Sequence, residues 1–169
     1  MRIFAISGSL RAQSGNTALL EALRRFAPPS VVVEIFHELE LIPPFNPDRE
    51  NDEPPAAVAH FRDGLKNADV VLFSTPEYAH GVPGVLKNAL DWVVGSGELY
   101  EKPVAILQTS ATRGANALAS LKATLAIMGT KLLVQTVIEP RADGVYANAD
   151  AVRAALAEIV TMASAQPKE

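Results

Sequence analysis

Short apolar runs alternate along this chain with longer segments whose apolar residues recur at helical spacing. The apolar runs predict five strands, over 2–7, 31–36, 68–73, 103–108 and 131–137. The helical spacing predicts five helices: one from about Asn16 to the Pro28-Pro29 pair, one over 56–67, and three whose apolar positions run over 82–93, 118–125 and 152–160. Strands alternating with helices indicate a parallel sheet covered on both faces. Spacing alone leaves the strand order open.

The segment 37–55 is the longest predicted connection, and it is rich in proline and acidic residues. Long connections in compact domains are usually functional or interfacial. An ordinary solvated loop, held down by Leu41, Ile42 and Phe45, fits equally well. We also expect a flexible turn over 94–100, an irregular segment over 139–146 and a frayed tail over 164–169. At this length, residues 1–169 are expected to form a single domain.

Composition narrows the function classes. The net charge of −4 argues against a nucleic-acid partner, which needs a basic surface. No apolar run approaches the length of a membrane span, and no signal peptide is recognisable, so no membrane partner is expected. The chain has no cysteine, which excludes disulfides and thiolate catalysis and favours a cytoplasmic location. Any redox chemistry therefore needs a bound cofactor.

The loop that follows the first predicted strand is rich in hydroxyl groups and leads directly into a helix. Backbone N–H groups and the helix dipole favour an anion there. Arg11 adds a guanidinium that can bind phosphate through two donors. The loop also fits an ordinary capped strand–helix turn, which would need no ligand. Its other candidate phosphate-binding residues are Ser9, Ser14, Asn16 and Thr17.

Two further loops, after the third and fourth strands, should lie at the same edge of the sheet, where ligands bind in open α/β folds. The third strand is followed by a loop of proline, glycine and small residues around Tyr78. Within it, Glu77 could pair with Lys87 or cap a helix start, and His80 is more easily explained as a bystander than as a proton donor. The fourth strand is followed by Thr109 and Ser110.

Other phosphate-binding sites fit this sequence less well. The Lys-Ser/Thr pair of a P-loop is absent, and Gly8 is followed by no glycine before Gly15, which breaks the dinucleotide spacing. A response-regulator receiver needs acidic residues at strand ends that here carry Ser7 and Thr75. A monophosphate attached to a planar ring is the ligand that suits all three loops best.

Two motifs carry a resemblance to a known family. Segment 8–16, GSLRAQSGN, resembles the phosphate loop of the NADPH-dependent FMN reductases. Segment 76–92, PEYAHGVPGVLKNALDW, is similar to their second signature, and 42–48, IPPFNPD, to the stretch between the two. The resemblance extends to about Leu125. It departs after the fourth strand, where family members often end the loop in Gly-Gly and this chain has a single glycine after Arg113.

The resemblance implies a flavodoxin-like three-layer αβα sandwich with a five-stranded parallel sheet in the order 2-1-3-4-5. It implies FMN bound without a covalent link, NADPH or NADH as the electron donor, and a homodimer or homotetramer. Leu41, Phe45 and Trp92 are candidate exposed apolar contacts between subunits, and Trp92 could instead lie in the core. The residues implied to bind the FMN phosphate are Ser9, Arg11, Ser14, Asn16 and Thr17. Those implied to line the flavin ring are Pro76, Glu77, Tyr78 and Gly81, with Thr109 and Ser110 from the third loop.

The implied function is an NAD(P)H oxidoreductase. It would pass electrons through FMN to a small-molecule acceptor such as a quinone, an azo compound, a metal oxyanion or free flavin, by a ping-pong mechanism. The flavin carries the chemistry, so we predict no catalytic side chain and no metal ligand. Arg113 could contact a phosphate of the nicotinamide cofactor or simply face water. Two alternatives remain: a flavodoxin-type electron carrier, and a flavin-free regulatory protein of the same fold.

Overall fold

The computed structural model describes residues 1–50, 53–140 and 149–166. Its strands are β1 (Arg2–Ser7), β2 (Val32–Phe36), β3 (Val70–Ser74), β4 (Pro103–Gln108) and β5 (Lys131–Val137). Its α-helices are α1 (Gly15–Phe26), α2 (Ala56–Asn67), α3 (Gly84–Asp91), α4 (Ala115–Ile127) and α5 (Ala149–Ser164). Two short 3₁₀ turns, Leu39–Leu41 and Pro47–Arg49, interrupt the long connection after β2.

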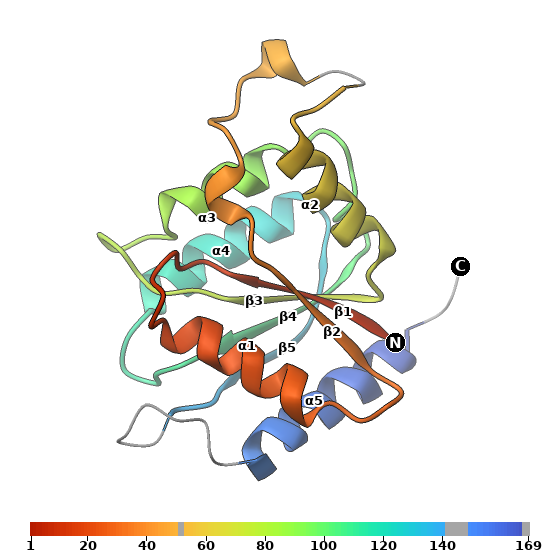
Figure 1. Cartoon of the computed structure of the whole chain (residues 1–169). Helices are drawn as coiled ribbons and strands as arrows, with labels where there is room; N and C mark the ends of the chain where they lie inside the picture. The colour runs from red at the N-terminus through yellow and green to blue at the C-terminus, as the bar shows by residue number, and fades with distance from the viewer. Residues whose placement is uncertain (51–52, 141–148, 167–169) are drawn as a thin grey trace.

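The five strands form one parallel sheet in the order β2-β1-β3-β4-β5. Helices α2, α3 and α4 cover one face of this sheet, and α1 and α5 cover the other (Figure 1). The predicted fold, a flavodoxin-like three-layer sandwich with this strand order, is confirmed. The strand order reverses direction at β1, because β2 lies on one side of it and β3 on the other.

Both faces of the sheet are buried, which explains why its inner strands read as continuous apolar runs. Along β1, Phe4 and Ile6 pack toward α2, while Ile3 and Ala5 pack toward α1 and α5. Strand β3 is buried at every position. The two apolar layers hold the inner strands rigidly, and so fix the positions from which the loops at their carboxyl ends leave.

Several predicted boundaries are shifted by one or two residues. Strand β3 begins at Val70 rather than 68, because Ala68 still closes the end of α2. Helix α3 begins at Gly84 rather than Val82, because a residue before proline is kept out of the helical conformation and Pro83 itself, with extended ψ, is the N-cap. Two predicted segments are described only in part. Residues 141–146 of the irregular segment and 167–169 of the frayed tail lie outside the described residues.

The long connection 37–55 is attached to α3 by side chains of the second motif. Asn88 accepts a hydrogen bond from the Phe45 N–H at 2.8 Å and donates to the Pro43 carbonyl at 2.9 Å. The Trp92 indole also donates to Pro43, at 2.8 Å. Trp92 is fully buried in the core, which confirms one of the two roles predicted for it and excludes the other, an exposed subunit contact. Leu41, by contrast, is exposed.

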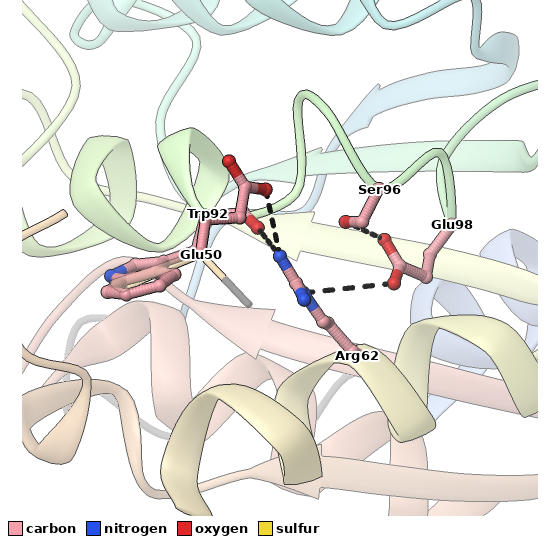
Figure 2. A network of polar contacts seen from close by, with 5 residues as sticks. All are labelled: Glu50, Arg62, Trp92, Ser96 and Glu98. Atoms are coloured by element: carbon pink, nitrogen blue, oxygen red, sulfur yellow. Dashed lines mark hydrogen bonds and ion pairs between the residues drawn. The ribbon is translucent and has the colours of Figure 1, made fainter. Parts of the chain in front are cut away.

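Arg62 of α2 holds the far end of the same connection (Figure 2). Its guanidinium donates to the Trp92 carbonyl at 2.7 Å and to Glu50 at 3.0 Å, and lies 3.8 Å from Glu98. The predicted turn at 94–100 is thereby linked to α2 through Glu98, and Leu99 anchors it in the core. None of the described helices is both long enough and apolar enough to cross a membrane.

Candidate functional site

The loops that follow β1, β3 and β4 lie together at the carboxyl edge of the sheet (Figure 1). Between them is a cavity of about 360 Å³, within the range of small-molecule sites. Six of the predicted site residues line it: Arg11, Asn16, Pro76, Glu77, Thr109 and Ser110. Arg113, which the sequence left as either a contact for the nicotinamide cofactor or a solvent-facing residue, also lines it. The described lining residues that the sequence did not single out are Gly15, Thr75, Gln108, Gly114 and Pro140.

Helix α1 begins at one end of this cavity. Ser14 is its N-cap, and the Ser14 hydroxyl accepts a hydrogen bond from the Thr17 N–H at 3.4 Å. Ser14 is buried and lines no described cavity, so its observed contact is with the helix itself. The first turn of α1 leaves backbone N–H groups without helical partners, and Arg11 is exposed beside it. This end of the cavity therefore favours an anion.

The remaining predicted phosphate residues face a second, smaller cavity of about 250 Å³. Ser9, Arg11 and Thr17 line it together with residues at the end of β2. Because β2 and β3 flank β1 on opposite sides, the first loop separates the two cavities. Arg11 lines both of them.

Hydrogen bonds to hydroxyl groups at the ends of β1 and β3 fix the conformation of the first loop. The Thr17 hydroxyl donates to Ser7 at 2.8 Å, and the Ser9 N–H also donates to the Ser7 hydroxyl at 3.3 Å. The Ser74 hydroxyl donates to the Asn16 side-chain oxygen at 3.0 Å, which ties the end of β3 to the start of α1. These bonds hold the loop in one conformation before any ligand arrives, which lowers the entropy cost of binding.

Gly8 lets the first and second loops approach closely. Its N–H donates to the Ser74 carbonyl at 2.9 Å, and a Cβ at this position would lie 2.1 Å from the Thr75 hydroxyl oxygen. No other residue fits without separating the two loops.

The second loop folds back on itself after Glu77. The backbones of Tyr78 and Gly81 exchange two hydrogen bonds across the central pair Ala79 and His80, whose φ angles are +49° and +59°. Such a turn normally carries Asn or Gly, so the loop is strained. Tyr78 is about half exposed and, like Gly81, does not line the 360 Å³ cavity. Their predicted role beside a flavin ring stays a prediction.

Glu77 binds the start of α4. Its carboxylate accepts hydrogen bonds from the N–H groups of Asn116 at 2.8 Å and Ala117 at 2.9 Å, and from the Asn116 side chain at 3.2 Å. The residue at the N-cap position is Gly114, which has no side chain to cap the helix, so Glu77 supplies the cap. The suggested pairing of Glu77 with Lys87 is wrong, because Lys87 pairs with Asp91 within α3.

These contacts keep Glu77 ionised. The Ala117 N–H bond, followed by the Asn116 side-chain bond, lowers the pKa of Glu77 below its ordinary value of 4.5. Burial acts in the opposite direction but does not prevail. His80 lies 3.5 Å from the same carboxylate and 3.0 Å from the Asn116 side-chain nitrogen. Glu77 therefore joins the second loop to the start of α4, which follows the third loop.

The third loop is held at both ends. The Ala111 N–H donates to the Glu139 carboxylate at 2.9 Å, and the Thr112 N–H donates to Ser110 at 3.3 Å. Gly114 enters α4 with φ +94°, a conformation that favours glycine. The role of Glu139 depends on β5 lying beside β4, and the spacing of the sequence gave no signal for that pairing.

Comparison with known proteins finds sequence relatives that are named as FMN reductases and quinone reductases. An NAD(P)H-dependent FMN reductase of Pseudomonas aeruginosa is 41% identical over 115 residues, which is 67% of this chain and 62% of that protein. A quinone reductase of Pseudomonas putida is 40% identical over 113 residues, which is 64% of this chain and 59% of that protein. The matches thus span about three fifths of the length of these curated relatives.

Solved structures match over nearly the whole chain. The flavoenzyme NAD(P)H:(acceptor) oxidoreductase FerB of Paracoccus denitrificans superposes with a TM-score of 0.79 at 27% identity, covering 96% of this chain and 97% of that one. A general stress protein of Treponema denticola, solved in complex with FMN, shares the fold with a TM-score of 0.62 at 13% identity, covering 95% and 98% of the two chains.

The family predicted from the two sequence motifs is confirmed by a family model. That model describes NADPH-dependent FMN reductases and matches residues 1–143, which include all three loops of the cavity. The chain belongs to the NADPH-dependent FMN reductase family.

Proposed function

We propose that this protein binds FMN at the carboxyl edge of its sheet and uses it to pass electrons from NAD(P)H to a small acceptor such as a quinone. The observation that carries the proposal is the 360 Å³ cavity, which joins the start of α1, where free N–H groups favour an anion, to the signature loop after β3 and the loop after β4. The printed names of the relatives support the same reaction class. A 2-hydroxy-1,4-benzoquinone reductase of a Burkholderia species, for example, is 39% identical over 113 residues.

The residues present fit the phosphate of FMN. The start of α1 offers N–H groups, and Arg11 stands beside it with no side-chain partner among the described residues. Among the described residues that line the cavity, the one carboxylate is that of Glu77, and it is directed to α4 and satisfied there. A phosphate at this end would therefore meet donors and positive charge.

The opposite part of the cavity fits a planar ring bearing hydrogen-bonding groups. Pro76, Thr109 and Ser110 line it from two loops, and the Glu77 bond to α4 fixes the separation of those loops. When bound, FMN would supply the hydride-accepting and electron-donating chemistry. The part played by this chain is to bind the cofactor, orient it and hold backbone N–H groups where negative charge develops.

We propose that donor and acceptor use this site in turn. A flavin would fill most of a cavity of this size, so we propose that donor and acceptor share the one ring face that stays open. The donor would have to leave before the acceptor enters, which is a ping-pong mechanism. Quinones, azo compounds, metal oxyanions and free flavin are the proposed acceptors.

We also propose that the protein assembles as a homodimer or homotetramer. This rests on the family resemblance, and the exposed apolar side chains Leu41 and Ile127 are candidate contacts. Light scattering on the Ile127→Glu variant tests the assembly, which should shift toward smaller species if α4 takes part. Unchanged mass would exclude that face.

Steady-state oxidation of NADPH tests the proposed function. The FMN-loaded protein is assayed at several fixed concentrations of a benzoquinone while NADPH is varied. Parallel lines in double-reciprocal plots are expected, because no step requires both substrates at once. FMN uptake without NADPH oxidation would instead favour an electron carrier, and a chain that takes up no FMN would favour the flavin-free alternative.

A further inference from the structure

Arg113 is the second guanidinium in the cavity, and FMN has only one phosphate. Arg11 enters the cavity from the loop after β1, and Arg113 enters from the loop after β4. Strand β3 lies between those two strands, so the loops leave the sheet about 10 Å apart. The start of α1 lies at the Arg11 end alone. If the FMN phosphate lies at the start of α1, Arg113 remains on the opposite side of the cavity without a phosphate to bind.

Two described carboxylates that contact the loops around the cavity are already bound elsewhere. Glu77 accepts from the N–H groups at the start of α4, and Glu139 accepts from the Ala111 N–H. The exposed Arg113 side chain has no hydrogen-bond or ion-pair partner among the described residues. Within the described part of the chain, the cavity thus presents a second guanidinium without a partner, beyond the one assigned to the flavin phosphate.

The backbone that carries Arg113 is fixed although its side chain is exposed. Upstream, Ala111 and Thr112 are hydrogen-bonded to Glu139 and Ser110. Downstream, Gly114 begins the helix that Glu77 caps. A fixed backbone places the guanidinium at one wall of the cavity, whereas an arginine needed only for solubility requires no such support.

We propose that Arg113 binds a phosphate group of the nicotinamide dinucleotide and helps determine which donor is used. This rests on the proposed function, because it assigns the first anion position to FMN. Both NADPH and NADH carry a pyrophosphate, and only NADPH carries a 2′-phosphate. A planar guanidinium can bind either group through two parallel hydrogen bonds.

The test compares the FMN-loaded wild type with Arg113→Ala and Arg113→Lys. Arg24→Ala is the control, because Arg24 is also exposed but lies on α1 and lines neither described cavity. Calorimetry measures the binding of NADP⁺ and NAD⁺, fluorescence quenching measures FMN affinity, and steady-state assays give KM and kcat for both donors. Arg113 is exposed, so folding of its variants should be preserved.

Arg113→Ala should weaken NADP⁺ binding and raise the KM for NADPH by about five- to tenfold, the low end for a charge-assisted bond at an exposed site. FMN affinity and kcat should be unchanged, and Arg113→Lys should be intermediate. An equal loss for NAD⁺ assigns the contact to the pyrophosphate, and a loss confined to NADP⁺ assigns it to the 2′-phosphate.

Two results would overturn the assignment while leaving the proposed function intact: unchanged affinity for both dinucleotides, or a loss of FMN affinity alone, which would make Arg113 a second clamp on the flavin. A wild-type protein that binds no FMN contradicts the proposed function, and the assignment of Arg113 falls with it.

Discussion

At the scale of single residues, Glu77 shows how a signature residue can act through structure rather than through the ligand. The family resemblance implied a place beside the flavin ring, and Glu77 does line the cavity. Its carboxylate oxygens, however, are taken by the first turn of α4. It thereby joins two loops that no sequence spacing connects.

Replacing Glu77 by Gln should give a stability loss that depends on pH. The folded-state pKa of Glu77 is lowered, so its ionised form stabilises the native protein above its ordinary pKa of 4.5. That contribution disappears as pH falls below 4.5 through the lowered value. Thermal melts of Glu77→Gln and wild type should differ most near neutral pH and converge in acid.

Glu158→Gln on α5 is the matched control, because Glu158 is exposed and its carboxylate has no hydrogen-bond or ion-pair partner among the described residues. Its difference from wild type should not change with pH. A Glu77→Gln difference that persists undiminished in acid would contradict the role of the charge.

Arg11→Ala should weaken FMN binding by about 1.5–3 kcal/mol, which is roughly ten- to hundredfold, because a charge-assisted hydrogen bond to phosphate is lost. Arg11→Lys should lose less, since the charge remains but the paired geometry does not. Quenching of flavin fluorescence measures the affinity. Unchanged affinity in Arg11→Ala would remove Arg11 from the phosphate site.

At the scale of elements, α2 packs unusually close to the sheet at Gly64. A Cβ there would lie 2.3 Å from the Phe4 ring of β1. Gly64→Ala should therefore destabilise the protein by about 1–3 kcal/mol, as overpacked cores do. Gly84 is the control, because it also lies in a helix but a Cβ there would meet nothing within 4 Å.

Gly84→Ala should leave stability unchanged or raise it by up to about 1 kcal/mol, because alanine favours helix. Urea denaturation measures both variants. Equal effects of the two substitutions would show that helix propensity, and not the contact with Phe4, decides the outcome at Gly64.

The sequence predicted which elements exist better than it predicted what connects them. Apolar runs locate strands such as β3 because a strand buried on both faces has no polar alternation. The predicted cavity residues Arg11 and Ser110 were found because they lie in loops that follow strand ends, and Arg11 also because its guanidinium can bind phosphate. Glu139 was missed because its partner Ala111 lies on the neighbouring strand's loop, and strand neighbours are not encoded by local spacing.

The sequence pattern also failed to predict which side chains are exposed and where the backbone is strained. Trp92 seemed available for a subunit contact, yet it is buried beneath the long connection and bound to Pro43. That arrangement depends on residues almost 50 positions apart. The strained turn at Ala79 and His80 carries no turn signature, because the usual Asn-Gly pair is absent.

At the scale of the whole molecule, binding and stability should be coupled. A ligand that binds only the folded protein stabilises it by about 2.7 kcal/mol at one hundred times its Kd, which raises the melting temperature by roughly 5–10 °C for a chain of this size. FMN should give this shift. Riboflavin at the same concentration should give less, because it lacks the phosphate. Equal shifts would contradict a phosphate site at the start of α1.

The central claim is that the cavity holds FMN and gives NAD(P)H access to it. Anaerobic titration of the FMN-loaded protein with NADPH tests this most directly, by following the blue absorption of the oxidised flavin. The account predicts that NADPH bleaches the absorption stoichiometrically and that a quinone then restores it. A chain that takes up no FMN, or that binds FMN which NADPH fails to bleach, would contradict the account.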